Sequence, residues 1–290
     1  MEISLQLVAQ VLLNGLSLSA IYVFVALGFT LLFGIMKVVN FAHGAFVILG
    51  GYALYHLMAD LHLNYLVSLP LAAIGVTAAA MALEWLVYRH FYQRMFQSMI
   101  GLLGLNMVLV QLSILVWSPN ERSIPLAIDG ILEFGGIIIP EDRLFIMGLA
   151  VFVLGGFWWF IRFTRSGLAM RAAAADLEVA QAQGIPTRRI YMIAFAVAIA
   201  LTALGGALYS QVYSLSPFMG DRALTMAFIT VILGGMGSIA GAALGSLILG
   251  FSDSVLSTFF GAATANFATF GLVLLLLLVR PWGLLGTPEP

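Results

Sequence analysis

The chain has 290 residues, of which 62% are hydrophobic and only 9% are charged, and its mean hydropathy is +1.07. Soluble domains usually carry about a quarter of charged residues, so this composition excludes an ordinary soluble protein and predicts an integral membrane protein. The formal net charge of -1 gives no indication of a nucleic-acid partner. The absence of cysteine excludes disulfides and thiolate metal ligands.

Long stretches without a charged residue predict the membrane spans. Because the bilayer core offers no water, backbone polar groups are satisfied inside helices. We therefore expect an all-α fold, a polytopic transmembrane helical bundle of about eight to nine spans in one domain, residues 1–290. The N-terminus lacks a basic region, and the apolar run after it is too long for a cleaved signal peptide, so the first span should be retained. The predicted spans are 6–33, 41–58, 65–88, 98–117, 143–162, 188–212, 223–236, 238–258 and 263–280, of which the two short pieces in 223–258 could be re-entrant.

The first interruption of the helical pattern is FGIMKVVNFAHGAF, residues 33–46. Irregular backbone at membrane depth survives only where it is buried or lines a cavity, and polar residues there are candidates for a solute pathway. Alternatively, Lys37 reaches the membrane interface, Asn40 caps the next helix and His43 bonds a neighbouring helix. The pathway candidates here are Gly34, Met36, Asn40 and His43.

A polar stretch, RAAAADLEVAQAQGI, occupies residues 171–185 of the long connection 163–187. Its alanines favour one helix from Ala169 to Gln183, and Gly184 with the nearby Pro186 should end that helix. The segment is either an ordinary solvated connector or an element that docks into a groove of a partner protein. Its length favours docking, because a connector could be much shorter.

The second interruption is LGGMGSIAGAALGSLILG, residues 233–250. Gly237, Gly241 and Gly245 fall four residues apart, so they line one helix face and permit close helix packing. Alternatively, these glycines let the chain unwind beside a pathway. No phosphate-binding loop follows, and the chain has no catalytic or metal-binding motif, so any ATP must bind another polypeptide. The pathway candidates here are Gly234, Met236, Gly237 and Ser238.

Basic residues near span ends favour the cytoplasm. With the N-terminus outside, nine basic residues fall inside and three outside, and the C-terminus is inside. The connection 118–142, rich in proline, glycine and acidic residues, is then external, and 163–187 is cytoplasmic. Inside lie Lys37, Arg89, Arg94, Arg162, Arg165, Arg171, Arg188, Arg189 and Arg280; outside lie Arg122, Arg143 and Arg222.

An internal repeat is expected between residues 28–50 and 228–250. Transporters are often built from duplicated halves, and both segments turn at the same predicted side of the membrane. The identical pairs, at an offset of 200, are Thr30/Thr230, Gly34/Gly234, Met36/Met236, Ala42/Ala242, Ile48/Ile248, Leu49/Leu249 and Gly50/Gly250.

Four stretches resemble one known family, the Liv-type permease subunits of ABC importers for branched-chain amino acids and related solutes. ALGFTLLFGIMKVVNFAHGAF (26–46) is similar to the family's first signature, and residues 171–185 are similar to its cytoplasmic coupling segment. GGMGSIAGAALG (234–245) and RPWGLLG (280–286) complete the match. Arg171 stands where the wider importer pattern has an acidic residue. The resemblance implies that the ATPase-coupling residues are Arg171, Ala172, Ala174, Asp176, Ala180, Gly184 and Ile185.

The resemblance implies a type II importer-like fold in a bacterial inner membrane and half of a solute pathway. It implies four kinds of partner: a second, homologous permease, two cytoplasmic ABC ATPase subunits, an extracytoplasmic solute-binding protein and membrane lipid. It implies no cofactor on this chain and no enzyme activity of its own. The alternative is a self-contained secondary carrier or channel. Ion coupling would need charges within the membrane, whereas Glu84 and Asp253 lie near predicted span ends.

Overall fold

The computed structural model of the chain describes residues 4–90, 95–124, 128, 130–134 and 136–286. This described part is built mainly from helices joined by short turns. Six of its helices are long and apolar enough to cross a membrane. They are α1 (Leu5–Met36), α3 (Tyr65–Leu86), α4 (Met95–Trp117), α5 (Glu141–Phe163), α8 (Thr187–Val212) and α10 (Ile239–Phe260).

Three further helices coincide with the remaining predicted spans. They are α2 (His43–Tyr55), which continues into a π-helical turn at His56–Asp60, α9 (Met219–Gly234) and α11 (Ala262–Val279). Every predicted span therefore corresponds to a helix, and the all-α polytopic bundle is confirmed. α2 and α9, with 13 and 16 residues, are shorter than a full crossing requires.

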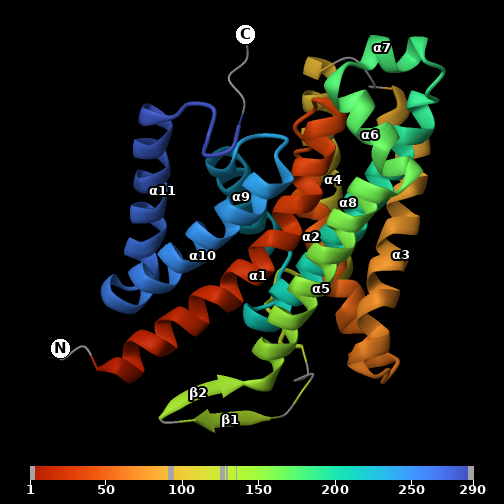
Figure 1. Cartoon of the computed structure of the whole chain (residues 1–290). Coiled ribbons are helices and arrows are strands. Elements are labelled where there is room, and N and C mark those ends of the chain that lie inside the picture. Colours follow the sequence, from red (N-terminus) through yellow and green to blue (C-terminus); the bar gives the residue numbers. More distant parts are fainter. Residues whose placement is uncertain (1–3, 91–94, 125–127, 129, 135, 287–290) are drawn as a thin grey trace.

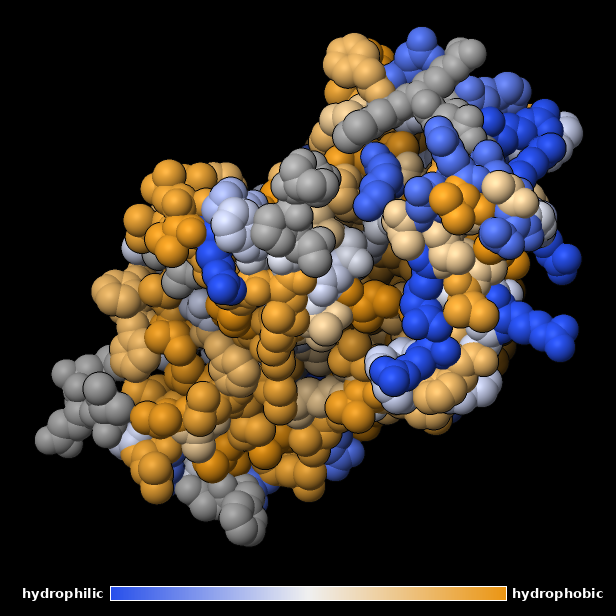
Figure 2. Space-filling view, turned by 45° about the horizontal axis from the view of Figure 1, so that its top comes forward, coloured by the Kyte–Doolittle hydropathy of each residue, from blue (hydrophilic) through white to orange (hydrophobic). Residues whose placement is uncertain are grey.

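The helices are arranged around α1 and α8. Figure 1 shows α1 crossing the molecule between α10 on one side and α5 on the other, and α8 packs against α1, α2 and α3. Two short helices, α6 (Arg165–Ala175) and α7 (Leu177–Ala182), lie at the same end of the molecule as the last turn of α11. Figure 2 shows hydrophilic residues gathered at this α6–α7 end, whereas most of the remaining visible face is apolar.

Glycines let α2 and α8 lie almost backbone to backbone. A Cβ atom at Gly50 of α2 would lie 2.2 Å from the carbonyl oxygen of Ala203, and one at Gly206 of α8 would lie 2.1 Å from the carbonyl oxygen of Val47. Both distances are shorter than any van der Waals contact. The α2–α8 crossing is therefore closed to any larger residue at these two positions.

α9 and α10 form a helical hairpin whose close packing the glycine spacing predicted. A Cβ at Gly241 would lie 2.2 Å from the carbonyl oxygen of Gly234, and one at Gly245 would lie 2.3 Å from that of Thr230. The packing face is confirmed at these two glycines. The third glycine of the pattern, Gly237, lies instead in the turn between the helices with φ +83°.

The segment after α11 folds back onto the end of α9. Leu284 N donates to the carbonyl oxygen of Leu233, and Leu285 N donates to that of Gly234, both at 2.9 Å. These bonds satisfy carbonyl groups that a helix end leaves free. The sequence did not predict this contact, because its partners are separated by about 50 residues and share no local pattern.

The connection 118–142 contains an antiparallel hairpin of β1 (Ile131–Phe134) and β2 (Ile137–Pro140) at the end opposite α6 and α7. No strand was predicted in this connection, which was expected only to be external and rich in proline, glycine and acidic residues. Its β-branched residues around a Gly-Gly pair are a hairpin signal that the overall apolar composition obscured. Arg94, which was predicted to lie inside, and Asp129, one of the acidic residues of the 118–142 connection, lie outside the described residues.

Candidate functional site

The predicted coupling segment forms two helices instead of one. Asp176, between α6 and α7, is extended, with φ −154° and ψ 113°. Its carboxylate Oδ1 accepts a hydrogen bond from the backbone N–H of Val179 at 3.0 Å. The prediction of a continuous helix from Ala169 to Gln183 is therefore wrong at Asp176. Aspartate caps a helix start better than it extends a helix, because its short side chain reaches the free N–H groups.

The predicted end of the coupling segment is confirmed. Gly184 adopts φ +79°, a left-handed conformation that glycine enters without steric cost. The backbone N–H of Gly184 donates to the Gln181 carbonyl oxygen at 2.9 Å, and that of Ile185 donates to the Ala180 carbonyl oxygen at 3.1 Å. This pattern is a glycine-dependent stop signal at a helix C-terminus.

α7 presents a solvent-accessible surface that carries both polar and apolar groups. Glu178 and Gln181 are exposed, and between them Val179 is 56% exposed. Among the predicted coupling residues, Arg171, Asp176 and Gly184 are exposed, Ala172, Ala174 and Ile185 are half-buried, and Ala180 is buried.

α6 is packed tightly onto the end of α5. A Cβ at Gly167 would lie 2.3 Å from the carbonyl oxygen of Phe160 and 2.5 Å from that of Ile161. The Thr164 hydroxyl caps α6 by accepting a hydrogen bond from Gly167 N at 3.0 Å. The backbones of α5 and α6 are therefore in direct contact at Gly167, with no side-chain layer between them.

The two interrupted segments meet each other at the α6–α7 end of the molecule. A Cβ at Gly34, near the end of α1, would lie 3.3 Å from the Cα of Gly237, in the α9–α10 turn. Lys37 ends α1 in a left-handed conformation with φ 53°. Both predicted repeat segments thus consist of a helix end, a turn and a helix start, although their common origin stays a prediction.

Asn40 and His43 are buried within the subunit, at 3% and 0% exposure. The carboxamide oxygen of Asn40 accepts hydrogen bonds from Ala42 N at 3.1 Å and from the Tyr88 hydroxyl at 3.2 Å. His43 Nε2 lies 2.9 Å from the carbonyl oxygen of Val25, which can only accept. These contacts join α2 to its neighbours, and a pathway role for either residue stays a prediction.

The other pathway candidates divide between the surface and the core. Gly234 is buried at the end of α9, whereas Met236 is 52% exposed in the turn that follows. Met36 is half-buried, and Ser238 caps α10 by accepting a hydrogen bond from Gly241 N at 3.0 Å. The structure therefore brings Gly34 and the 235–238 turn together, but it leaves Asn40 and His43 away from that surface.

A buried tyrosine–aspartate pair that the sequence did not predict lies inside the bundle. The Tyr22 hydroxyl of α1 donates to Asp253 Oδ2 of α10 at 2.7 Å, and Asp253 is only 5% exposed. Nearby, the Arg222 guanidinium lies 4.9 Å from the ring centroid of Tyr213. The position of Asp253 near a predicted span end gave no signal of burial, and only the crossing of α1 over α10 produces it.

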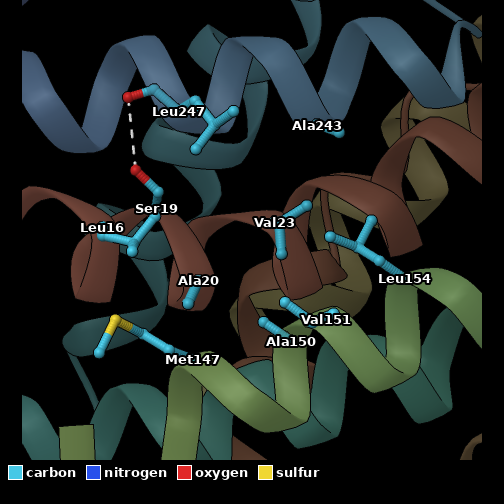
Figure 3. A pocket seen from close by; sticks show the side chains of 10 residues that line it. All are labelled: Leu16, Ser19, Ala20, Val23, Met147, Ala150, Val151, Leu154, Ala243 and Leu247. Atoms are coloured by element: carbon cyan, nitrogen blue, oxygen red, sulfur yellow. Dashed lines mark hydrogen bonds between the residues drawn. The ribbon is translucent and has the colours of Figure 1, made fainter. Parts of the chain in front are cut away.

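A laterally open groove lies between α5 and α10, with α1 between them. Figure 3 shows side chains from the three helices converging, with the Ser19 hydroxyl donating to the Leu247 carbonyl oxygen at 3.3 Å. The hollow is apolar, with a volume of about 160 Å³. A second hollow of about 480 Å³ continues from it towards α6 and is also lined by Leu154 and Ala243. The groove therefore leads from the middle of the bundle to α6.

Comparison with known proteins identifies the chain as a permease component of a transport system. Residues 11–279 match the family described as the permease component of the branched-chain amino acid transport system. The chain belongs to this permease family. The permease is 32% identical to the high-affinity branched-chain amino acid transport system permease protein BraD of Pseudomonas aeruginosa, covering 97% of this chain and 96% of that protein.

Two further relatives agree with this assignment. The permease is 31% identical to the high-affinity branched-chain amino acid transport system permease protein LivH of Escherichia coli K12, over 97% of this chain and 96% of that protein. It is 27% identical to a probable branched-chain amino acid transport permease protein LivH of Methanocaldococcus jannaschii, over 92% and 89%. No solved structure gives a significant match. The resemblance stated from the sequence motifs is thereby confirmed over nearly the whole chain.

Proposed function

We propose that this membrane-embedded permease imports branched-chain amino acids or related small solutes, driven by ATP that is bound on separate subunits. The family description and the names of the relatives support the substrate class. The complete importer would contain this chain, a second homologous permease, two cytoplasmic ABC ATPase subunits and an extracytoplasmic solute-binding protein. In this proposal the chain itself needs no cofactor.

The exposed surface of α7, attached to two long helices, supports an ATPase-coupling role most directly. α7 is joined through the α6 contact at Gly167 to α5, and through Pro186 to the first residue of α8, Thr187. An ATPase that binds α7 more tightly in one conformation would favour that conformation of the permease. Movement of α7 would reorient α5 and change access to the pathway from one side of the membrane to the other. The close contact of Gly34 with Gly237 makes this junction our candidate for the cytoplasmic end of the pathway.

Introduced cysteines provide the test of the coupling role, because the natural chain has none. We expect a cysteine at the exposed Gln181 of α7 to cross-link to the ATPase subunit in the assembled importer, with a yield that changes between ATP-bound and nucleotide-free states. A cysteine at the exposed Glu133 of β1 serves as the matched control and should not cross-link. Equal yields at both positions, or none at Gln181 in an active importer, would refute docking at α7.

The same two variants test the orientation in the inner membrane. We propose that the N-terminus and the β1–β2 hairpin lie outside and that α6, α7 and the C-terminus lie in the cytoplasm. The positive-inside rule supports this orientation. Nine basic residues lie on the predicted cytoplasmic side and three on the predicted outer side. In intact spheroplasts, a membrane-impermeant thiol reagent should label Glu133→Cys and leave Gln181→Cys unlabelled until the membrane is permeabilised. The reverse labelling pattern would invert the topology.

A further inference from the structure

A basic crevice lies where α5, α6 and the start of α10 meet. Its volume is about 480 Å³, and its polar lining consists of the Arg162 and Arg171 side chains beside the indole of Trp158. The Arg162 guanidinium lies 5.5 Å from the Trp158 ring centroid, and Arg171 Nη2 donates to the Arg162 carbonyl oxygen at 3.4 Å. Two cations from different helices therefore converge on one hollow.

Neither guanidinium has a carboxylate within ion-pair distance in the described part of the chain. The crevice is also lined by Ile239 and Ala240, which form the first turn of the 22-residue helix α10. The N-terminus of a helix carries free N–H groups and a partial positive charge. Because the charged side chains in the lining are both cationic and the start of α10 adds a partial positive charge, an anionic group is the complementary ligand of the crevice.

An apolar groove continues from this basic crevice along the side of the bundle. The two hollows share Leu154 and Ala243, and the apolar one lies over α1 between α5 and α10 (Figure 3). It is open laterally, since Val151 on its rim is 72% exposed and Leu247 is 38% exposed. A free inorganic anion would use the crevice but leave this groove empty. A ligand with an anionic head and an apolar chain fits both.

We propose that an anionic phospholipid binds here, with its phosphate at Arg162 and Arg171 and one acyl chain along the groove between α5 and α10. Aromatic and basic residues at a helix end are suited to the level of lipid headgroups. The bound lipid bridges α6 and α10. α6 contains the start of the coupling segment, and α10 belongs to the α9–α10 hairpin. The anionic lipid content of the membrane would thereby influence how firmly the coupling helices are held. This inference does not depend on the transported solute.

The test compares lipid binding to the assembled importer with and without the two guanidinium groups. In native mass spectrometry from detergent, we expect retained phosphatidylglycerol on the unmodified complex and little phosphatidylcholine. Arg162→Gln with Arg171→Gln should weaken phosphatidylglycerol retention about 30-fold, since each basic residue near an anionic headgroup contributes on the order of fivefold. The matched control is Arg188→Gln with Arg189→Gln, two exposed arginines of α8 outside the crevice, and it should retain the lipid.

Two more measurements separate the possible occupants. Ala243→Trp, which narrows the shared part of the hollows, should reduce lipid retention, whereas protection against thermal unfolding by inorganic phosphate alone would indicate a free anion and overturn the proposal. A cross-link from Val151→Cys to the second permease would show that a protein covers the groove, and would also overturn the proposal.

If the double glutamine variant fails to fold, Arg162→Lys with Arg171→Lys keeps both charges and should restore both folding and lipid retention. Equal retention of phosphatidylcholine by the unmodified complex would contradict the charge argument.

Discussion

Gly184→Pro is expected to abolish solute-stimulated ATP hydrolysis by the reconstituted importer while leaving membrane insertion intact. Gly184 has φ +79°, and proline is restricted to φ near −65°, so the substitution cannot keep the observed turn. It also removes the N–H that donates to the Gln181 carbonyl oxygen. The exit of the chain from α7 towards α8 must change, and the surface proposed to dock on the ATPase changes with it.

The matched control at this position is Gly184→Asn. Asparagine enters the left-handed conformation more readily than other non-glycine residues, and no atom lies within 4 Å of a Cβ built at Gly184. This variant should keep most of the stimulated ATPase activity. The informative measurement is solute-stimulated hydrolysis in vesicles with the binding protein present, together with copurification of the ATPase subunits. Full stimulation of the proline variant would remove α7 from the coupling pathway.

Gly206→Val is expected to destabilise the folded permease strongly. A Cβ at Gly206 would lie 2.1 Å from the carbonyl oxygen of Val47, and backbone atoms of α2 cannot rotate away as a side chain would. Separating α2 from α8 would disrupt the core around them. We expect the free energy of unfolding to fall by about 3 kcal/mol or more, which is at or above the upper end of the usual cost of overpacking a core. The thermal midpoint of the purified subunit complex in detergent, followed by tryptophan fluorescence, measures the effect.

The control for this substitution is Gly148→Val in α5. It makes the same chemical change within a long helix, but no atom lies within 4 Å of a Cβ built at Gly148. The added methyl groups would enter open space, so the midpoint should change little. If the thermal midpoint falls equally in both variants, the low helix propensity of valine would explain the effect. The α2–α8 contact would then contribute little to stability.

The helical elements were predictable because membrane burial leaves a strong local signal. Charge-free runs of sufficient length located every helix from α1 to α11 except the short pair in the coupling segment. The stop at Gly184 was also predictable, since glycine in that conformation and a following proline act through their own backbones. The break at Asp176 was not, because the alanines on either side favour one continuous helix and a single capping side chain decides the matter.

Contacts between distant segments had no local signal at all. Nothing near Tyr22 indicates that its hydroxyl meets Asp253, or that residues 284 and 285 cap α9. The same holds for the convergence of Arg162 and Arg171 on the start of α10, which places both cations beside the apolar groove. The glycine pattern of 233–250 did predict a close packing face. It did not indicate which helix packs against that face, and only the structure shows that this helix is α9.

The sequence by itself determined that this protein is a multi-span membrane permease, where its helices run and which segment lies outside the apolar bundle. It could do so because hydrophobicity, helix stops and family motifs depend on residues that are adjacent in the sequence. Only the tertiary structure decided which polar residues are buried within the subunit, which glycines touch, and which cations face the groove. Those properties depend on helix crossings, and a crossing is set by the packing of two surfaces that are far apart in the chain.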